Sequence, residues 1–167
     1  LLNRILNGEH NLRVAVLVND FGSINIDAEL VVGVDENMIS LANGCVCCSI
    51  RDDLVETVMD VLARPEQPEY ILLEASGVAD PSSIALTFAD PNLRDRIRLD
   101  SVIAVVDAEQ VFAYPDYPQV QQVQLRQIGF SDMVILNKVD LAGVKATQQV
   151  RDWIDQHMNR VRIVEAN

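Results

Sequence analysis

The chain has 167 residues, of which 49% are hydrophobic and 23% charged, so it can bury the core of one domain and does not have the composition of a disordered segment. Its formal net charge of -12, from 25 acidic and 13 basic residues, argues against nonspecific nucleic-acid binding. Because the sequence has neither an apolar run of membrane-spanning length nor a basic-then-apolar leader, we expect neither a membrane-bound nor a secreted protein.

Apolar patterning in the first half of the chain predicts helices that alternate with short strands. In order, it predicts an opening helix that ends at Gly8, a buried strand over 13–19, a hairpin of 31–34 with 38–41, a helix from Ser49 to before Pro65, and a buried strand over 70–73.

The second half continues the alternation. It predicts a short helix that begins at Asp80-Pro81 and stops before Pro91, a strand over 100–107, a Gln-rich helix after the prolines at 115 and 118, a strand over 133–136, a helix from about 144 to 159, and a strand over 161–164. Strands that alternate with helices predict an α/β fold, with a mostly parallel sheet covered by helices on both faces.

Polar residues follow several of these strands directly. They are Asn19 and Asp20, the segment 74–77, Asp107, and the segment 137–140. Parallel α/β sheets bind ligands at the carboxyl ends of their strands. We therefore expect these four groups to gather along one edge, where one ligand touches several of them.

All three cysteines lie in one segment, as Cys45, Cys47 and Cys48. Thiolates are soft ligands that suit Zn(II), Cu(I) or Co(II), and the helix predicted from Ser49 would stabilise them through its N-terminal dipole. Three protein ligands leave a fourth position open, which favours metal exchange over a closed structural site. The pattern predicts a metal site, for which Asp27 or Glu29 is a candidate fourth ligand.

Two other interpretations of the cysteines remain open. One is a redox thiol pair, although the C-x-x-C spacing is absent and a disulfide between the neighbours Cys47 and Cys48 would be strained. The other is a buried turn of small apolar residues. Clustered thiols without partners elsewhere favour a reducing compartment, so we expect a cytoplasmic protein.

The segment Asn137-Lys138-Val139-Asp140 follows a predicted strand and suits guanine recognition. The Asp140 carboxylate can accept hydrogen bonds from the ring N–H and the exocyclic amine of guanine, a pair of donors that adenine lacks. The Lys138 stem can lie against the base, and Asn137 can help to hold the loop. The alternative is an exposed strand-to-helix turn, in which Asp140 only caps the next helix.

The segment Glu74-Ala75-Ser76-Gly77 suits the phosphate side of a nucleotide. A carboxylate at Glu74 can hold Mg²⁺ through water, and Gly77 lets the backbone approach a terminal phosphate. Asp20, after the first strand, is a further candidate for the Mg²⁺ shell. The alternative is an ordinary glycine turn at the end of a strand.

The cysteine motif, the segments 74–77 and 137–140, and Asp20 together resemble the CobW-type metallochaperone GTPases, which belong to the SIMIBI class of P-loop GTPases. The resemblance covers essentially the whole chain, and the Gly-Cys-x-Cys-Cys motif is its specific part. Asp20 departs from it, because the family usually has Glu at that position.

The resemblance implies that GTP hydrolysis drives delivery of Zn²⁺ or Co²⁺ to a client metalloprotein. It makes Cys45, Cys47 and Cys48 the metal ligands. Glu74, Ser76 and Gly77 would sit by Mg²⁺ and the γ-phosphate, with Glu74 the catalytic acidic residue and Asp20 nearby. Asn137, Lys138 and Asp140 would sit by guanine. Related GTPases often dimerise, so a homodimer is also consistent with it.

Two parts of the family pattern have no counterpart in residues 1–167. The Gly-rich phosphate loop ending in Gly-Lys-Thr would stand immediately before Leu1, and the C-terminal domain would follow the last residues. We therefore expect a GTPase-domain fragment that is inactive by itself, and a non-catalytic metal-binding module is the alternative for the chain as given.

Overall fold

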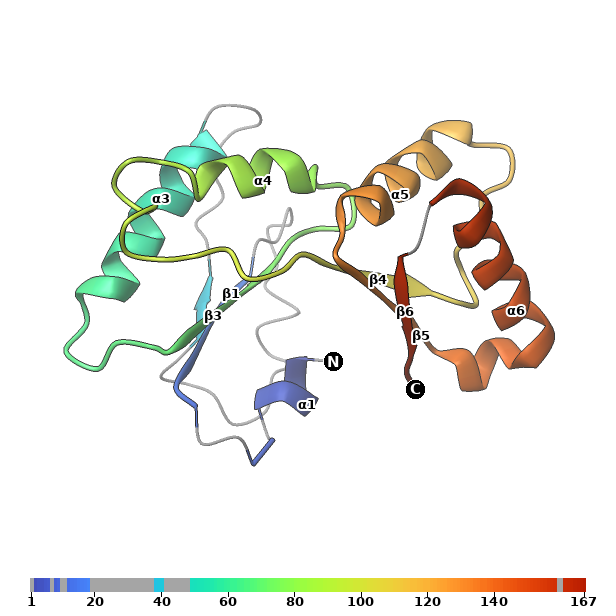
Figure 1. Ribbon diagram of the computed structural model, residues 1–167, viewed down its shortest axis with the longest axis horizontal. Helices are drawn as coiled ribbons and strands as arrows, with labels where there is room; N and C mark the ends of the chain where they lie inside the picture. Colours follow the sequence, from blue (N-terminus) through green and yellow to red (C-terminus); the bar gives the residue numbers. More distant parts are fainter. Residues whose placement is uncertain (1, 7, 10–11, 19–37, 41–48, 159–160) are drawn as a thin grey trace. The chain divides into compact units, whose positions relative to one another are not determined.

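The computed structural model describes residues 2–6, 8–9, 12–18, 38–40, 49–158 and 161–167 (Figure 1). The chain divides into two compact units. The N-terminal unit comprises residues 1–79 and 84–98, and the C-terminal unit comprises residues 80–83 and 99–167.

The N-terminal unit is built on a three-stranded parallel sheet in the order β2-β1-β3. Its elements are α1 (Leu2–Leu6), β1 (Val14–Val18), β2 (Met38–Ser40), α3 (Ser49–Ala63), β3 (Tyr70–Glu74) and the larger part of α4 (Pro81–Thr87). Each strand agrees with a predicted one, and the Ser49 helix ends before Pro65 as predicted.

Residues of β1 alternate between the two faces of this sheet, as the period of a strand requires. Ala15 and Leu17 pack with the buried α3 residues, among them Val58. Val14 and Val16 belong to a second cluster, which includes Leu2 of α1 and Leu72 of β3. Helix α3 therefore covers one face of this sheet, and Leu2 of α1 packs on the other, so the continuous apolar run of β1 is explained by burial on both sides.

The C-terminal unit has a second three-stranded parallel sheet, in the order β4-β5-β6. Its elements are β4 (Ile103–Asp107), α5 (Pro118–Phe130), β5 (Met133–Asn137), α6 (Val139–His157) and β6 (Arg162–Glu165). Every described strand pairing in both units is parallel, which confirms the predicted α/β class.

Both long helices of the C-terminal unit pack on one face of its sheet. Ile128 of α5 and Ile154 of α6 join one buried cluster with Val106, Val134 and Leu136, which point to the same side of their strands. On the alternate positions, Ile103, Val105 and Val164 are 44%, 52% and 38% exposed. Helices were predicted on both faces. In the N-terminal unit both faces contact helical residues, the second one through Leu2 alone, whereas the described helices of the C-terminal unit cover one face.

Three predicted elements differ from the structure by more than a residue at one end or in their pairing. Strand β4 begins at Ile103 rather than at 100, because the N–H of Val102 donates to the carboxylate of Asp132 (2.7 Å) instead of to a neighbouring strand. Helix α6 begins at Val139 rather than near 144, but Gly143, with φ 75° and ψ 166°, interrupts it. Its long part therefore starts where the periodicity indicates, and it ends at His157.

The third difference concerns the predicted hairpin. Residues 31–34 lie outside the described part of the chain, whereas β2 pairs in parallel with β1, Val16 lying opposite Met38.

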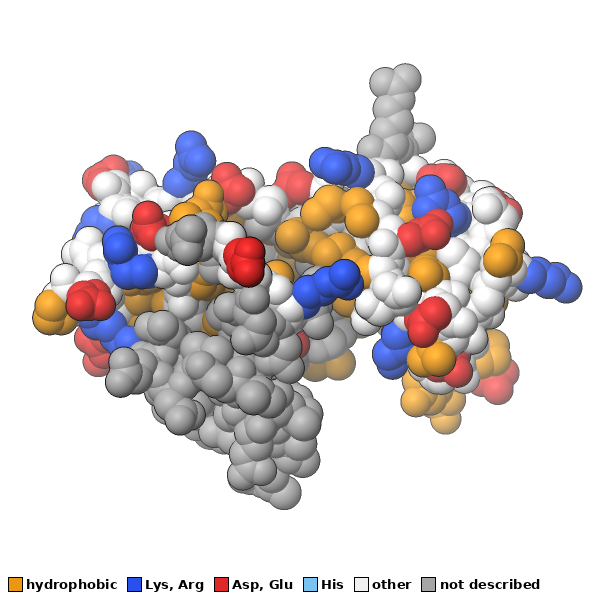
Figure 2. All heavy atoms as spheres, turned by 90° about the horizontal axis from the view of Figure 1, so that it is seen from below, with side chains coloured by type: hydrophobic (Ala, Val, Ile, Leu, Met, Phe, Trp, Pro, Cys, Tyr) orange, Lys and Arg blue, Asp and Glu red, His pale blue; other side chains and the backbone are white. Residues whose placement is uncertain are grey.

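On the face shown in Figure 2, acidic and basic side chains are interspersed with hydrophobic ones. Among the described residues, no helix combines the length and the apolar character needed to cross a membrane.

Candidate functional site

The predicted base-recognition segment begins at the last residue of β5. Asn137 lies opposite Asp107, the last residue of β4, and the carbonyl of Asn137 accepts a hydrogen bond from the N–H of Ala108 (3.0 Å). The β4–β5 pairing thus continues to the carboxyl ends of both strands, as expected for a site at this edge.

Lys138 has a left-handed backbone conformation, with φ 60° and ψ 34°. Among the described residues it is the only one other than glycine with a positive φ. This conformation costs a non-glycine residue roughly 1–2 kcal/mol, so neighbouring contacts must hold it. The main contact of its side chain is an ion pair of 2.6 Å between Lys138 Nζ and Asp107 Oδ2.

Asp107 uses its other carboxylate oxygen within its own turn. Oδ1 accepts hydrogen bonds from the backbone N–H groups of Glu109 (2.9 Å) and Gln110 (3.1 Å). Partial burial raises the pKa of Asp107, but the hydrogen bonds from Lys138, Glu109 and Gln110 outweigh it and hold the pKa below the ordinary 3.8. The hydrogen bond to Asp107 likewise raises the pKa of Lys138, so both groups are charged at neutral pH.

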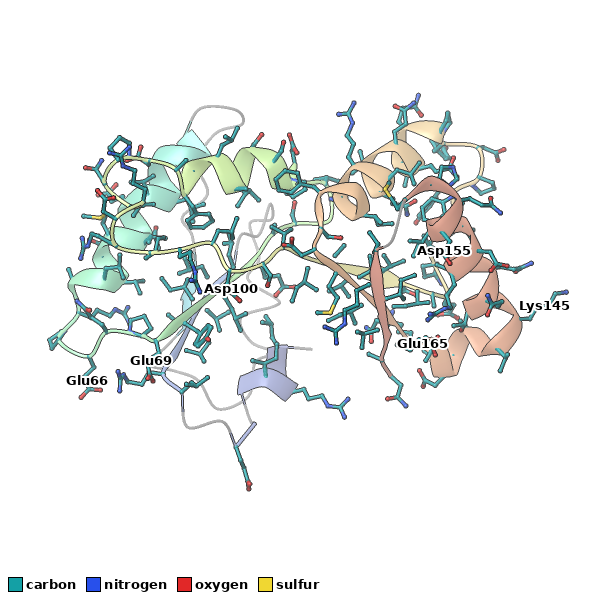
Figure 3. All side chains as sticks on the ribbon, in the orientation of Figure 1. Glu66, Glu69, Asp100, Lys145, Asp155 and Glu165 are labelled. Carbon is teal, nitrogen blue, oxygen red and sulfur yellow. The ribbon has the colours of Figure 1, made fainter. Side chains whose placement is uncertain are left out.

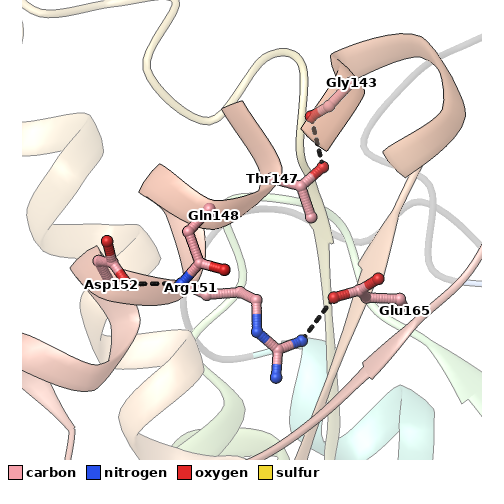
Figure 4. A network of polar contacts seen from close by, with 6 residues as sticks. All are labelled: Gly143, Thr147, Gln148, Arg151, Asp152 and Glu165. Carbon is pink, nitrogen blue, oxygen red and sulfur yellow. Dashed lines mark hydrogen bonds and ion pairs between the residues drawn. The ribbon is translucent and has the colours of Figure 1, made fainter. Parts of the chain in front are cut away.

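The other side of the segment is held by the chain that follows β6. The N–H of Ala166 donates to the carbonyl of Leu136 (2.9 Å), and the N–H of Val139 donates to the carbonyl of Ala166 (3.3 Å). Just before Ala166, Glu165 pairs with Arg151 of α6 at 2.7 Å (Figure 4). The segment 137–140 is therefore fixed from both neighbouring strands.

Asp140 lies exposed in the first turn of α6. The backbone N–H groups of Leu141 and Ala142 both donate to the carbonyl of Lys138 at 3.1 Å, which closes this turn. After Gly143 the helix restarts, and Thr147 Oγ1 donates to the Gly143 carbonyl at 2.9 Å (Figure 4). The turn presents a carboxylate to solvent beside the strand end.

In the N-terminal unit, Glu74 is the last residue of β3 and is exposed. The following turn is closed by a hydrogen bond from the N–H of Ala79 to the carbonyl of Ser76 (2.9 Å). Ser76 Oγ is buried and has no hydrogen-bond partner among the described residues. Apart from Gly77 itself and its two neighbours in the chain, no described heavy atom lies within 4 Å of the place that a Cβ would take there.

The remaining predicted site residues, Asp20, Cys45, Cys47 and Cys48, lie outside the described residues, as do Asp27 and Glu29. Within the described part of the chain, no group of three or more His, Cys, Asp or Glu side chains is placed to hold a metal ion. The structure brings Lys138 together with Asp107, which the sequence placed at the strand edge but to which it gave no role. The sequence did contain a sign of this role, because Asp107 is a carboxylate at the end of β4, the strand that precedes β5 and Lys138 in the chain.

A family model of the CobW/HypB/UreG nucleotide-binding domain matches residues 1–165. The match spans nearly the whole chain, and the chain belongs to this family.

Curated relatives carry names that fit the family. The chain is 36% identical, over 86% of its length, to a protein of Escherichia coli named zinc chaperone YjiA. It is 26% identical to the zinc chaperone CobW of a Sinorhizobium species, over 96% of this chain and 52% of that protein. It is 30% identical to the zinc-regulated GTPase metalloprotein activator 1 of Dictyostelium discoideum, over 95% of this chain and 40% of that protein.

The chain spans about half the length of the curated relatives it matches, or less. Among solved structures, it resembles the Zn(II)-bound YjiA GTPase of E. coli, with a TM-score of 0.66 and 26% identity over 98% of this chain and 51% of that one. A Zn(II)-bound triple mutant of YjiA GTPase gives a TM-score of 0.69 at 25% identity, over 98% of this chain and 52% of that one. The fold is therefore of the P-loop GTPase type that the sequence predicts.

Proposed function

We propose that this chain is the GTPase domain of a GTP-dependent metallochaperone, which binds Zn²⁺ and releases it to a client protein when GTP is hydrolysed. The observation that carries the proposal is the segment 137–140. It ends a central parallel strand, is held from both neighbouring strands and presents an exposed carboxylate, in a chain of the CobW/HypB/UreG family. Similar proteins are named zinc chaperones and a zinc-regulated GTPase.

In this proposal, Asp140 selects the base. Its carboxylate accepts the N1–H and the 2-amine of guanine, and it rejects adenine because the carboxylate would then be left unpaired. The stem of Lys138 lies against the ring, and Asn137 keeps the loop closed through its carbonyl contact with Ala108.

Glu74, Ser76 and Gly77 form the phosphate side, with Asp20 as a further acidic residue. The exposed carboxylate of Glu74 suits Mg²⁺, because this ion keeps several of its waters and needs only one or two protein carboxylates. The space that the described residues leave at Gly77 supports a close approach of phosphate to the backbone, and the buried hydroxyl of Ser76 is a group that a ligand could satisfy. Mg²⁺ would neutralise phosphate charge there, and Glu74 would hold it as the catalytic acidic residue.

Cys45, Cys47 and Cys48 are the proposed ligands of the transported metal. Zn²⁺ is the first choice because relatives are named zinc chaperones, and Co²⁺ suits the same thiolate chemistry. Residues 1–167 would be the nucleotide-binding part of a longer, cytoplasmic parent protein, which acts as a monomer or a homodimer. The chain covers 52% of the CobW relative, which supports the longer parent protein but does not bear on its location or oligomeric state.

The test uses the intact parent protein and compares its turnover of GTP and ATP. We expect GTP to be hydrolysed and ATP to be a poor substrate, and we expect Asp140→Ala to remove the preference. A matched control is Asp155→Ala, an acidic residue of α6 well away from this turn (Figure 3). Equal turnover of both nucleotides by the unaltered protein would contradict the assignment of Asp140.

Zinc binding is tested separately, by titration of the metal into the parent with all three cysteines changed to Ser. We expect the tight site to disappear, because the thiolates supply its ligands. Unchanged zinc affinity would remove the metal half of the proposal.

A second candidate is a metal-binding module without catalysis, and it applies to residues 1–167 in isolation. It is favoured by the chain spanning about half of its relatives. It predicts zinc binding by residues 1–167 without GTP turnover, and measurable turnover by this segment would exclude it.

A further inference from the structure

Asp107 joins two separate parts of the C-terminal unit. One oxygen of its carboxylate closes the turn after β4, through Glu109 and Gln110, and the other binds Lys138 in the turn after β5. The backbone contact between Ala108 and Asn137 fastens the same two turns together. A single side chain therefore fixes both the position of its own turn and the lysine of the base-recognition segment.

We propose that Asp107 is a positioning residue for guanine nucleotide binding, which holds the Lys138 side chain in the orientation that receives the base. The proposal rests on the proposed function, because it concerns the same site. Asp107 itself touches no part of the nucleotide in this account and acts through Lys138.

The physical reason is the conformational freedom of lysine. A free lysine side chain loses rotamer entropy when a ligand orders it, and this loss weakens binding. The ion pair with Asp107 orders Lys138 before the nucleotide arrives. Lys145, in the helix that follows Lys138, shows the contrast, since it extends outward from α6 (Figure 3). A carboxylate is required rather than an amide, because an amide cannot offer the charge that attracts the ammonium group.

The chain offers a matched control at the opposite end of the same pair of strands. Asp132, just before β5, accepts the backbone N–H of Val102 with its carboxylate (2.7 Å). Asp107→Asn and Asp132→Asn are therefore the same chemical change in the same unit, and each alters a carboxylate that accepts backbone hydrogen bonds. Of these two carboxylates, only that of Asp107 forms an ion pair with the segment 137–140, through Lys138.

The experiment measures the affinity of the intact parent protein for GDP, IDP and ADP. IDP carries hypoxanthine, which keeps the ring N–H of guanine but lacks its 2-amine. We expect Asp107→Asn to weaken GDP and IDP binding equally, by roughly 10-fold, because it disturbs the lysine and not the reading of the amine. Asp132→Asn should stay within about twofold of the unaltered protein, and Asp140→Ala should weaken GDP more than IDP.

A double variant separates positioning from a general loss of structure. If Asp107 acts through Lys138, the variant Asp107→Asn with Lys138→Met should bind GDP no more weakly than Lys138→Met alone. Additive losses, or equal effects of Asp107→Asn and Asp132→Asn, would overturn the positioning role. Failure of the unaltered protein to distinguish GDP from ADP would instead overturn the proposed function.

Discussion

The two units have the same plan, three parallel strands with helices against them, yet their strand ends differ. At the end of β5, an ion pair and backbone hydrogen bonds hold the segment 137–140 from both sides. At the end of β3, the turn from Ser76 to Ala79 has open space at Gly77 and a buried Ser76 hydroxyl without a partner among the described residues. The segment 137–140 is thus held by contacts within its own unit, whereas the described residues around the turn after β3 leave the Ser76 hydroxyl without a partner.

The cores of the units are separate too. The cluster around Leu17 and Val58 and the cluster around Leu136 and Ile154 share no residue. The chain's one tryptophan, Trp153, is buried in the second cluster and stacks edge-on with Phe112 at 5.5 Å. Its fluorescence therefore reports on the C-terminal unit, so the unfolding of this unit can be compared with that of the whole chain.

The largest expected effect comes from a cavity in either core. Leu17→Ala and Leu136→Ala each remove a side chain that is 0% exposed, and each should lower the free energy of unfolding by about 2–5 kcal/mol. Leu136→Ala should lower the midpoint of the Trp153 fluorescence transition. Leu17→Ala should lower the midpoint seen by circular dichroism more than that of the fluorescence.

Val144→Ala is the control for these variants, because Val144 is 90% exposed and its truncation should change either midpoint little. If Leu17→Ala shifted both midpoints equally, the two cores would unfold together, and the two units would not be independent in stability.

A smaller effect distinguishes two glycines, one in each unit. Gly143→Ala should cost roughly 1 kcal/mol or more, since the backbone there has φ 75°, which strains any residue with a Cβ. Gly77→Ala should leave the free energy of unfolding nearly unchanged, because a Cβ there meets no described atom within 4 Å apart from its chain neighbours. Chemical denaturation of both variants provides the comparison.

The glycine pair also tests the proposed function. Although stable, Gly77→Ala should lower GTP turnover, because the Cβ would occupy the space proposed for phosphate. Full turnover by this variant would place the phosphate elsewhere.

The start of α4 should contribute about 1 kcal/mol through Asp80, a typical value for a helix cap. Asp80 Oδ1 accepts from the N–H (3.0 Å) and the hydroxyl (2.7 Å) of Ser82, and Oδ2 accepts from the Ser83 hydroxyl (3.1 Å). We expect Asp80→Ala to lower the unfolding free energy measured by denaturant, and Asp80→Ser to recover much of it. Equal losses in both variants would show that the cap is not the cause.

The smallest effect is the pH dependence of the Asp107–Lys138 pair. The pKa of Asp107 lies below 3.8, so its contribution to stability is present above that pH and is lost as the pH falls through the lowered value. The pKa of Lys138 lies above 10.5, so its contribution is present below that pH and is lost as the pH rises through the raised value.

The difference in unfolding free energy between the unaltered protein and Asp107→Asn should therefore stay constant from about pH 5 to pH 9. It should shrink at acid pH, below the ordinary value of 3.8. A difference that changed steadily across neutral pH would mean that another group titrates with the pair.

Much of the fold could be predicted because the strands are continuous apolar runs, and the need to bury these runs determines where the strands lie in the sequence. The runs at β1, β3 and β5 lie within a residue of their predicted bounds at each end. The predicted start of α6 near residue 144 matches the part of the helix that follows the break at Gly143, whereas its first turn, which begins at Val139, was not predicted. Strand β4 was predicted too long because its start depends on Asp132, a residue distant in the sequence.

The candidate site was predictable in its residue types but not in its contacts. A strand followed by Asn-Lys-Val-Asp indicates base recognition from local order alone. The partner of Lys138 is Asp107, on another strand. The local sequence around each residue does not specify which strands lie next to each other, so this contact could not be predicted. The placement of Cys45, Cys47 and Cys48 remains a prediction, because these residues lie outside the described part of the chain.

The most direct test of the account is the zinc affinity of the intact parent protein, measured with Mg²⁺ and a non-hydrolysable GTP analogue and again with Mg²⁺ and GDP. If one scaffold couples the nucleotide to the metal, zinc should bind more tightly with the GTP analogue, and zinc should tighten the binding of that analogue relative to GDP by the same factor. Equal zinc affinities with the two nucleotides would contradict the account.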